Sequence, residues 1–270
     1  MKVWVNGSIV DTKGAIDADD RGVTLGDGIF ETLALIDRTP LRLARHLARL
    51  ISGAGVLGIP VNVDAETLID AVTEICTAED VMEGSVRITL LRGSAPRGLL
   101  PPAKTEPTLM ISAATGPVGK GTPVEAIIAT STRRNDRSPL TRIKSTNYLD
   151  AVIAAREAAH AGAGEAIMLN TLDLVAEATA ANVFCRIGDE LVTPLVSDGA
   201  LPGIMRACVM ETETVTERSI SAAELKCADE VFLTSSLSIR PVVRIDGQVI
   251  GGGSIGATAA RLESLPRRAG

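Results

Sequence analysis

One carboxylate in an apolar run restricts how this chain can fold. Residues 174–184 are mostly small or apolar, and Glu177 is the only charged residue among them. A carboxylate is costly to bury unless it is paired with a cation. Glu177 therefore lies either on the exposed side of a strand, which is the commoner arrangement, or against a cation inside the fold.

A lysine precedes this run in a segment that favours the second alternative. Residues 142–149 read Arg-Ile-Lys-Ser-Thr-Asn-Tyr-Leu, so that Lys144 follows a basic loop. An enzyme that uses pyridoxal phosphate needs a lysine to form a Schiff base and a charged partner for the pyridine nitrogen. Lys144 and Glu177 can supply both groups. A single lysine after a basic loop is more often a solvated surface residue, so the two residues alone leave both alternatives open.

Composition and charge argue against several classes of function. The 270 residues are 46% hydrophobic, which is enough for one large domain or two smaller ones. The net charge is -6, there is no basic block, and only 2% of the residues are aromatic, which argues against a nucleic-acid partner. No signal-peptide pattern and no apolar run of membrane-spanning length is present. We expect a cytoplasmic protein without nucleic-acid or membrane partners.

The cysteines and histidines lack the spacing of a metal site. The chain has 4 cysteines, far apart in sequence, which we expect to be reduced thiols: Cys76, Cys185, Cys208 and Cys227. His46 and His160 are the only histidines, so a zinc site or a Ser-His-Asp triad has little material. We expect no bound metal.

The first 118 residues predict a mixed domain of strands and helices. Asn6-Gly7 lies between two short β runs, a strong signal for a type I′ hairpin. Asp64 is suited to cap a helix. The predicted elements are that hairpin, helices over 46–57 and 64–78, and strands over 85–91 and 108–113.

Three arginines of this half have two interpretations each. Arg49 borders a predicted apolar stripe formed by Leu47, Leu50, Ile51 and Ala54. It is either a solvated helix residue or a phosphate ligand, because a guanidinium offers a fixed fork to phosphate oxygens. Arg92 and Arg97 lie on a turn-rich loop, which either holds a substrate carboxylate or is simply an exposed polar loop.

A Gly- and Pro-rich segment over 115–123 is the predicted linker to a second domain. The predicted strands after it are 124–130, 165–170, 174–186, 190–193 and 230–238. The other predicted elements are a helix over 147–161 capped by Asn147, a helix opened by Gly199–Arg206 that runs to about Val215, and a hairpin around Asp246-Gly247. Exposed amides at the start of the later helix are suited to phosphate. The hydroxyls at 234–236 are suited to phosphate oxygens or to capping a turn.

Seven motifs occur in the order in which they occur in the fold-type IV pyridoxal-phosphate enzymes, which the chain resembles over nearly its whole length. They are Gly26–Glu31, His46–Leu50, Arg92–Gly98, Lys144–Leu149, Glu177 with Asn182–Phe184, Gly203–Arg206 and Thr234–Ser236. The resemblance implies an α/β (α+β) fold of two domains, 1–118 and 119–270, with the second carrying the lysine and the cofactor in the cleft between them. It also implies a homodimer or a larger assembly.

The resemblance also implies a role for individual residues. Lys144 matches the Schiff-base lysine, and Glu177 matches the acid at the pyridine nitrogen. Tyr148 is similar to a tyrosine near the cofactor's phenolic oxygen in branched-chain members, where the spacing from the lysine is one residue longer. The remaining matches are Arg49, the amides of Ile204 and Met205 and the hydroxyls of Ser235 and Ser236 at the phosphate, with Phe30 and Arg97 at the substrate.

The implied activity is that of an aminotransferase acting on an amino acid of the D- or branched-chain type and a 2-oxo acid. Phe30 and Gly203–Arg206 resemble the 4-amino-4-deoxychorismate lyases instead, so release of pyruvate and 4-aminobenzoate is the alternative. Leu99 stands where the D-amino acid enzymes use histidine. An inactive homologue is a third alternative, against which the presence of both Lys144 and Glu177 argues.

Overall fold

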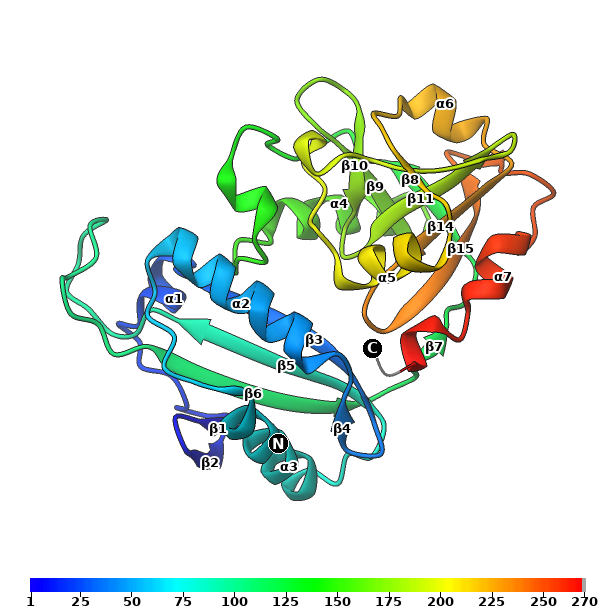
Figure 1. Ribbon diagram of the computed structural model, residues 1–270. Coiled ribbons are helices and arrows are strands. Elements are labelled where there is room, and N and C mark those ends of the chain that lie inside the picture. The colour runs from blue at the N-terminus through cyan, green and yellow to red at the C-terminus, as the bar shows by residue number, and fades with distance from the viewer. Residues whose placement is uncertain (269–270) are drawn as a thin grey trace. The chain divides into compact units, whose positions relative to one another are not determined.

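The computed structural model describes residues 1–268, and the chain forms two compact units (Figure 1). Unit 1 comprises Met1–Val118, Ile143–Asn147 and, at the end of the described residues, 267–268, whereas unit 2 comprises Gly119–Arg142 and Tyr148–Pro266. The expected division at residue 118 would place Lys144 in the second domain. The segment that carries Lys144 groups with unit 1, because its backbone pairs with the start of a strand there.

Unit 1 is built on a six-stranded sheet with the order β2-β1-β6-β5-β3-β4. Its neighbouring strands are antiparallel. Asn6 and Gly7 have φ values of 44° and 96°, so the predicted hairpin is confirmed. The elements are β1 (Lys2–Val5), β2 (Ser8–Asp11), α1 (Arg21–Leu25), β3 (Gly28–Ile36), β4 (Thr39–Pro40), α2 (Leu43–Leu57), α3 (Ala65–Ala78), β5 (Gly84–Leu91) and β6 (Thr108–Thr115).

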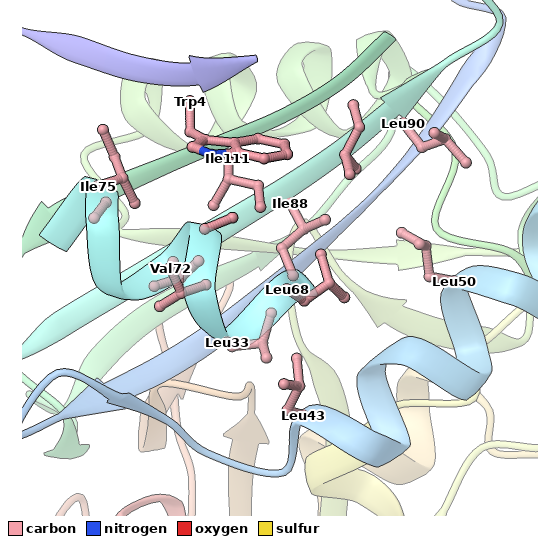
Figure 2. Close-up of a cluster of buried hydrophobic side chains, with 14 of the residues drawn as sticks. Trp4, Leu33, Leu43, Leu50, Leu68, Val72, Ile75, Ile88, Leu90 and Ile111 are labelled. Atoms are coloured by element: carbon pink, nitrogen blue, oxygen red, sulfur yellow. The ribbon is translucent and has the colours of Figure 1, made fainter. Parts of the chain in front are cut away.

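The helices α2 and α3 bury one face of this sheet. Figure 2 shows their side chains, among them Leu50 and Leu68, pointing toward Leu33 of β3 and Ile88 of β5. Because side chains alternate along a strand, the buried Leu33 leaves Phe30 and its even-numbered neighbours on the opposite face. The apolar core of unit 1 therefore positions Phe30 away from the helices.

Helix α2 differs from the prediction in its first residue and in one member of its apolar stripe. It begins at Leu43, one turn earlier than predicted, and His46 is among its buried residues. Leu50 and Ala54 are buried as predicted, but Ile51 is 47% exposed, so its place in the stripe was wrong. Helix α3 and its cap were predicted correctly, since the Asp64 side chain accepts a hydrogen bond from the Thr67 amide at 2.9 Å.

Unit 2 is built on a ten-stranded mixed sheet with the central order β10-β9-β8-β15-β14-β11-β12-β13. Strands β8 and β9 pair in parallel, as do β8 and β15, whereas β11, β14 and β15 are antiparallel neighbours. The strands are β7 (Gly119–Lys120), β8 (Val124–Ile128), β9 (Glu165–Leu169), β10 (Val175–Ala178), β11 (Asn182–Ile187), β12 (Glu190–Thr193), β13 (Thr216–Glu217), β14 (Glu230–Thr234), β15 (Ser238–Ile245) and β16 (Gln248–Val249). The helices are α4 (Leu149–His160), α5 (Ile204–Thr212), α6 (Ala222–Lys226) and α7 (Ala257–Leu262), with 3₁₀ turns at Pro139–Arg142 and Val196–Asp198 and a third at Leu265–Arg267 near the end of the chain.

Three predictions for this half of the chain need correction. The strand expected over 174–186 is two strands, β10 and β11, separated by a turn. The linker expected over 115–123 contains β7, which pairs with β15. Asn147 does not cap α4, because its side-chain amide donates instead to the Gly26 carbonyl at 3.0 Å. The hairpin around Asp246-Gly247 is confirmed, with φ values of 49° and 78°.

Two further observations bear on the sequence-based expectations. Cys76, Cys185 and Cys208 are buried and Cys227 is exposed, and none of the four forms a disulfide. Within residues 1–268, none of the helices combines the length and the apolar character that crossing a membrane requires. The mixture of sheets and helices confirms the predicted α+β class.

Candidate active site

Lys144 is held in unit 1 by its own backbone. The Phe30 amide donates to the Lys144 carbonyl at 2.9 Å, and the Thr146 amide donates to the Gly28 carbonyl at 2.9 Å. The Thr146 hydroxyl adds a hydrogen bond of 2.7 Å to the Gly26 carbonyl. These bonds extend the edge of β3 and fix the base of the lysine side chain, whatever its amine contacts.

Two cations approach the ring of Phe30. The Nζ atom of Lys144 lies 4.5 Å from the ring centroid, and the guanidinium carbon of Arg87 lies 3.5 Å from it. Arg87 is opposite Thr32 in the register of β3 and β5, which places it on the same face of the sheet as Phe30. Positive charge on this face favours a carboxylate ligand. Arg87 was missed from the sequence, although its alternation with the apolar Val86 and Ile88 is a usable signal.

Arg49 binds a buried carboxylate on the other face. Its Nε and Nη2 atoms donate to the two oxygens of Glu31 at 2.8 and 2.7 Å. Glu31 is only 1% exposed, and its Oε2 atom also lies 2.7 Å from Nδ1 of His46. Neither the glutamate nor the histidine was assigned a role from the sequence, since a carboxylate on a strand and a histidine on a helix carry no spacing that pairs them.

The protonation of this cluster follows from its burial. Burial by itself would raise the pKa of Glu31, but hydrogen bonds from Arg49 and His46 outweigh it and hold the pKa below its ordinary value. Burial lowers the pKa of His46, with the Glu31 hydrogen bond opposing the shift and the charges of Arg49 and Lys144 adding to it. Near neutral pH, Glu31 is therefore ionised and His46 is neutral, donating its Nδ1 proton to the carboxylate.

Glu177 is buried in unit 2 rather than displayed on an exposed strand face. It is 9% exposed and forms an ion pair with Arg134, whose Nη2 lies 2.9 Å from Oε1. The Leu201 amide donates to Oε2 at 2.9 Å, and Nδ2 of Asn182 lies 3.5 Å from the same oxygen. The positive charge of Arg134 offsets the desolvation cost of burying the Glu177 carboxylate. The sequence did not indicate Arg134, because its spacing from Glu177 follows no recognisable pattern.

The N-terminus of α5 lies next to this carboxylate. Gly203 occupies the N-cap position without a side-chain hydrogen bond, so the first amides of the helix, including those of Ile204 and Met205, have no intrahelical acceptor. A Cβ atom added at Gly203 would lie 1.9 Å from Oδ1 of Asn182. Asn182 also donates to the Leu201 carbonyl at 2.8 Å, which ties Glu177 to the start of the helix.

Hydroxyl groups at the end of β14 complete the cluster in unit 2. Asn182 pairs with Thr234 in the register of β11 and β14, which places this strand end beside the Glu177 cluster. The Ser235 hydroxyl accepts from the Leu237 and Ser238 amides at 3.3 and 3.2 Å, so it caps a turn. The Thr234 hydroxyl is buried and has no partner within residues 1–268. Glu177, Ile204, Met205, Ser235 and the half-buried Ser236 are thus brought into one region.

Other predicted residues lie outside these two clusters. Arg92 is buried and hydrogen-bonds to Asp27 and to the Leu57 and Gly58 carbonyls, which differs from both interpretations of it, a ligand of a substrate carboxylate and a member of an exposed polar loop. Arg97 is exposed on the loop after β5, and Tyr148 occupies the N-cap position of α4. Among residues 1–268, no group of three or more His, Cys, Asp or Glu side chains is arranged to hold a metal ion.

Comparisons with known proteins agree along almost the entire chain. The model of the amino-transferase class IV family matches residues 28–245. An unverified branched-chain-amino-acid aminotransferase of Methanocaldococcus jannaschii is 33% identical over 97% of this chain and 94% of the relative. A D-alanine aminotransferase of Staphylococcus haemolyticus is 31% identical over 97% of this chain and 95% of the relative.

A solved structure and a lyase add to these relatives. The branched-chain aminotransferase of Thermoproteus uzoniensis, solved with norvaline, has a TM-score of 0.87 at 31% identity and covers 99% of this chain and 94% of its own. An aminodeoxychorismate lyase of Bacillus subtilis is 29% identical over 96% of this chain and 91% of the relative. The similarity therefore extends to aminotransferases and to a lyase alike.

Proposed function

This chain belongs to the amino-transferase class IV family of pyridoxal-phosphate-dependent enzymes, and we propose that Lys144 carries the cofactor for transfer of an amino group between an amino acid and a 2-oxo acid. The observation that carries the proposal is the buried Glu177 beside the uncapped start of α5. A carboxylate suited to a pyridinium nitrogen and amides suited to a phosphate are the two anchors that this cofactor needs.

The donor groups fit the cofactor chemically. The ion pair with Arg134 favours the charged form of Glu177, which can then hold a proton on the pyridine nitrogen. The amides of Ile204 and Met205 with the hydroxyls of Ser235 and Ser236 are proposed phosphate ligands, and the unpartnered Thr234 hydroxyl beside them is a further donor. Arg49 is the proposed guanidinium ligand of the same phosphate. Tyr148 stays a prediction as the neighbour of the phenolic oxygen.

Lys144 has two tasks in the proposed reaction. When bound, pyridoxal phosphate supplies an aldehyde that joins an amine and a ring that takes up the electron pair left on the α-carbon. The amine of Lys144 would remove the α-proton of the substrate and later return a proton, acting as a general base and then as a general acid. The hydrogen bond from the Phe30 amide to the Lys144 carbonyl holds the base of this side chain in place.

The groups around Phe30 support a choice of substrate. We propose amino acids with an apolar, branched-chain type of side chain, since the aromatic ring offers an apolar surface and Arg87 can bind the carboxylate. The exposed Arg97 stays a predicted carboxylate ligand of D-amino acids, with Leu99 rather than histidine near it. D-amino acids are thus the second substrate class.

We also propose that the enzyme is at least a dimer. Leu99 and Leu100, adjacent in the loop between β5 and β6, are 84% and 89% exposed, and a second copy of the chain would cover them. Light scattering should give twice the chain mass, and the double substitution Leu99→Ser with Leu100→Ser should weaken the assembly. Leu172→Ser, at an isolated position, should leave it unchanged. The location in the cytoplasm stays a prediction.

A single-turnover experiment tests the function. The cofactor-loaded enzyme is mixed with L-leucine, D-alanine or L-glutamate without a 2-oxo acid, and the pyridoxamine form and the new 2-oxo acid are quantified. Conversion with L-leucine supports the proposed substrate class, and conversion with D-alanine alone would replace it with the D-amino acid class. Release of pyruvate and 4-aminobenzoate from aminodeoxychorismate, without conversion of any amino acid, would establish the lyase instead.

Lys144→Ala supplies a check that does not depend on turnover. After borohydride reduction, a peptide containing Lys144 should carry the cofactor mass in the natural protein, and no peptide should carry it in the variant. Labelling of a different lysine would contradict the assignment of Lys144.

A further inference from the structure

We propose that Glu31 and His46 are positioning residues that orient the guanidinium of Arg49 toward the phosphate of the cofactor. This inference rests on the proposed function, in which Arg49 is a phosphate ligand. The geometry assigns them the role, because Glu31 lies between the histidine and the arginine and hydrogen-bonds to both.

The contacts fix the direction of the guanidinium group. Glu31 accepts from Nε and Nη2 of Arg49 through two separate oxygens, which sets the plane of the fork. An arginine has five N–H donors, and the carboxylate engages only those on the edge formed by Nε and Nη2. An arginine held in this way loses little conformational entropy when it binds a tetrahedral anion.

The position of His46 explains why the carboxylate itself stays fixed. His46 and Arg49 are three residues apart on α2, so they project from the same face of the helix toward β3. The Nδ1 proton of His46 holds the same oxygen that accepts from Nη2 of Arg49. Because His46 is neutral, it adds a hydrogen bond without a second positive charge, and one carboxylate balances one guanidinium.

Packing alone does not account for this arrangement. Burying a carboxylate and a guanidinium costs several kcal/mol of desolvation, which apolar side chains of similar size would avoid. Glu31 also follows Phe30, whose amide donates to the carbonyl of Lys144. Consecutive residues of β3 therefore anchor the lysine segment and the arginine.

The test compares two ligands of the cofactor-free enzyme that differ only in the phosphate. Apparent affinities for pyridoxal phosphate and for pyridoxal are measured by titration. The ratio of the first affinity to the second measures how strongly the enzyme binds the phosphate group. Glu31→Gln should lower the ratio about 10- to 100-fold, the loss typical of hydrogen bonds to a charged group, through weaker binding of pyridoxal phosphate alone. His46→Asn, whose amide can donate near the position of Nδ1, should retain the ratio, whereas His46→Leu should lower it.

Two controls separate the possible failures. Glu230→Gln changes another buried glutamate, which accepts from the Thr258 and Ala259 amides in unit 2, and it should reduce stability without changing the ratio. Arg49→Gln should lower the ratio at least as much as Glu31→Gln. An unchanged ratio in Arg49→Gln would refute Arg49 as a phosphate ligand and with it that part of the proposed function.

Two outcomes would overturn the positioning role of Glu31 and His46. If Arg49→Gln lowers the ratio but Glu31→Gln and His46→Leu do not, the pair has no positioning role, although the proposed function stands. Equal weakening of both ligands together with a loss of melting temperature, as from general destabilisation, would overturn it as well. If Glu31→Gln folds poorly, the comparison of His46→Asn with His46→Leu still tests the positioning role.

Discussion

Arg134 and Glu177 form an ion pair in which Nη2 of the arginine lies 2.9 Å from Oε1 of the glutamate. Arg134 also donates to the Gly199 carbonyl at 3.3 Å, so its guanidinium bridges the carboxylate and the loop before α5. This pair allows a charged group to lie in the apolar run 174–184, and it determines the orientation in which the carboxylate is presented.

Removal of Arg134 should therefore deprive the buried carboxylate of Glu177 of this ion pair. We expect Arg134→Gln to lower the free energy of unfolding by about 3 kcal/mol, measured by urea denaturation of the cofactor-free protein. Arg244→Gln, which breaks an exposed pair with Glu125, should cost less than about 1 kcal/mol. Similar losses in the two variants would show that the Arg134–Glu177 pair contributes no more than a surface ion pair.

Loss of the arginine above Phe30 should mainly affect substrate binding. Arg87→Leu removes a guanidinium 3.5 Å from the ring centroid, and KM for both the amino acid and the 2-oxo acid should rise about 10-fold or more. Steady-state kinetics with each substrate varied in turn measure the effect. Arg156→Leu, at an exposed position of α4, is the control and should leave KM unchanged. A fall in kcat at constant KM would argue against carboxylate binding by Arg87.

Two glycines should respond to alanine in opposite directions. In Gly203→Ala the new Cβ would collide with Oδ1 of Asn182, so the bonds of Asn182 must rearrange, at a cost of about 1–3 kcal/mol. Gly55 lies in α2 with open space around it, and Gly55→Ala should stabilise the protein by about 0.5–1 kcal/mol because alanine favours a helix. Melting temperatures of the two variants should move apart, and a tolerated Gly203→Ala would contradict the tight packing of the α5 start.

The acid dependence of stability should include a contribution from Glu157. Hydrogen bonds from the Ser131 and Thr130 side chains and amides lower the pKa of Glu157 from 4.5 to about 2. Because the folded pKa lies below the unfolded one, the stabilisation is fully present above about pH 4.5 and is lost as the pH falls toward 2. Glu157→Gln should be less stable than the natural protein at pH 7, and the difference should shrink in urea denaturation at pH 3. A difference in unfolding free energy that does not change with pH would contradict this contribution of Glu157.

Local patterns in the sequence determined much of the secondary structure. Asn6-Gly7 and Asp246-Gly247 specify hairpins because their backbone must adopt positive φ, a requirement that a distant residue does not alter. Asp64 specifies a helix start because its acceptor is the Thr67 amide, three residues away. The family motifs also predicted Lys144, Glu177 and the start of α5 as cofactor ligands, and these roles stay predictions.

Contacts between distant residues were decided only by the tertiary structure. Arg134 contacts Glu177, Glu31 contacts His46 and Arg49, and the Asn147 side chain donates to the Gly26 carbonyl instead of capping α4. Periodicity reports which face of an element is apolar, but it does not report which charged groups meet once two elements pack. A buried charge must find its partner wherever the fold places one. The sequence by itself could show only that Glu177 would need a cation if it were buried, and the folded chain shows that it is buried and paired with Arg134.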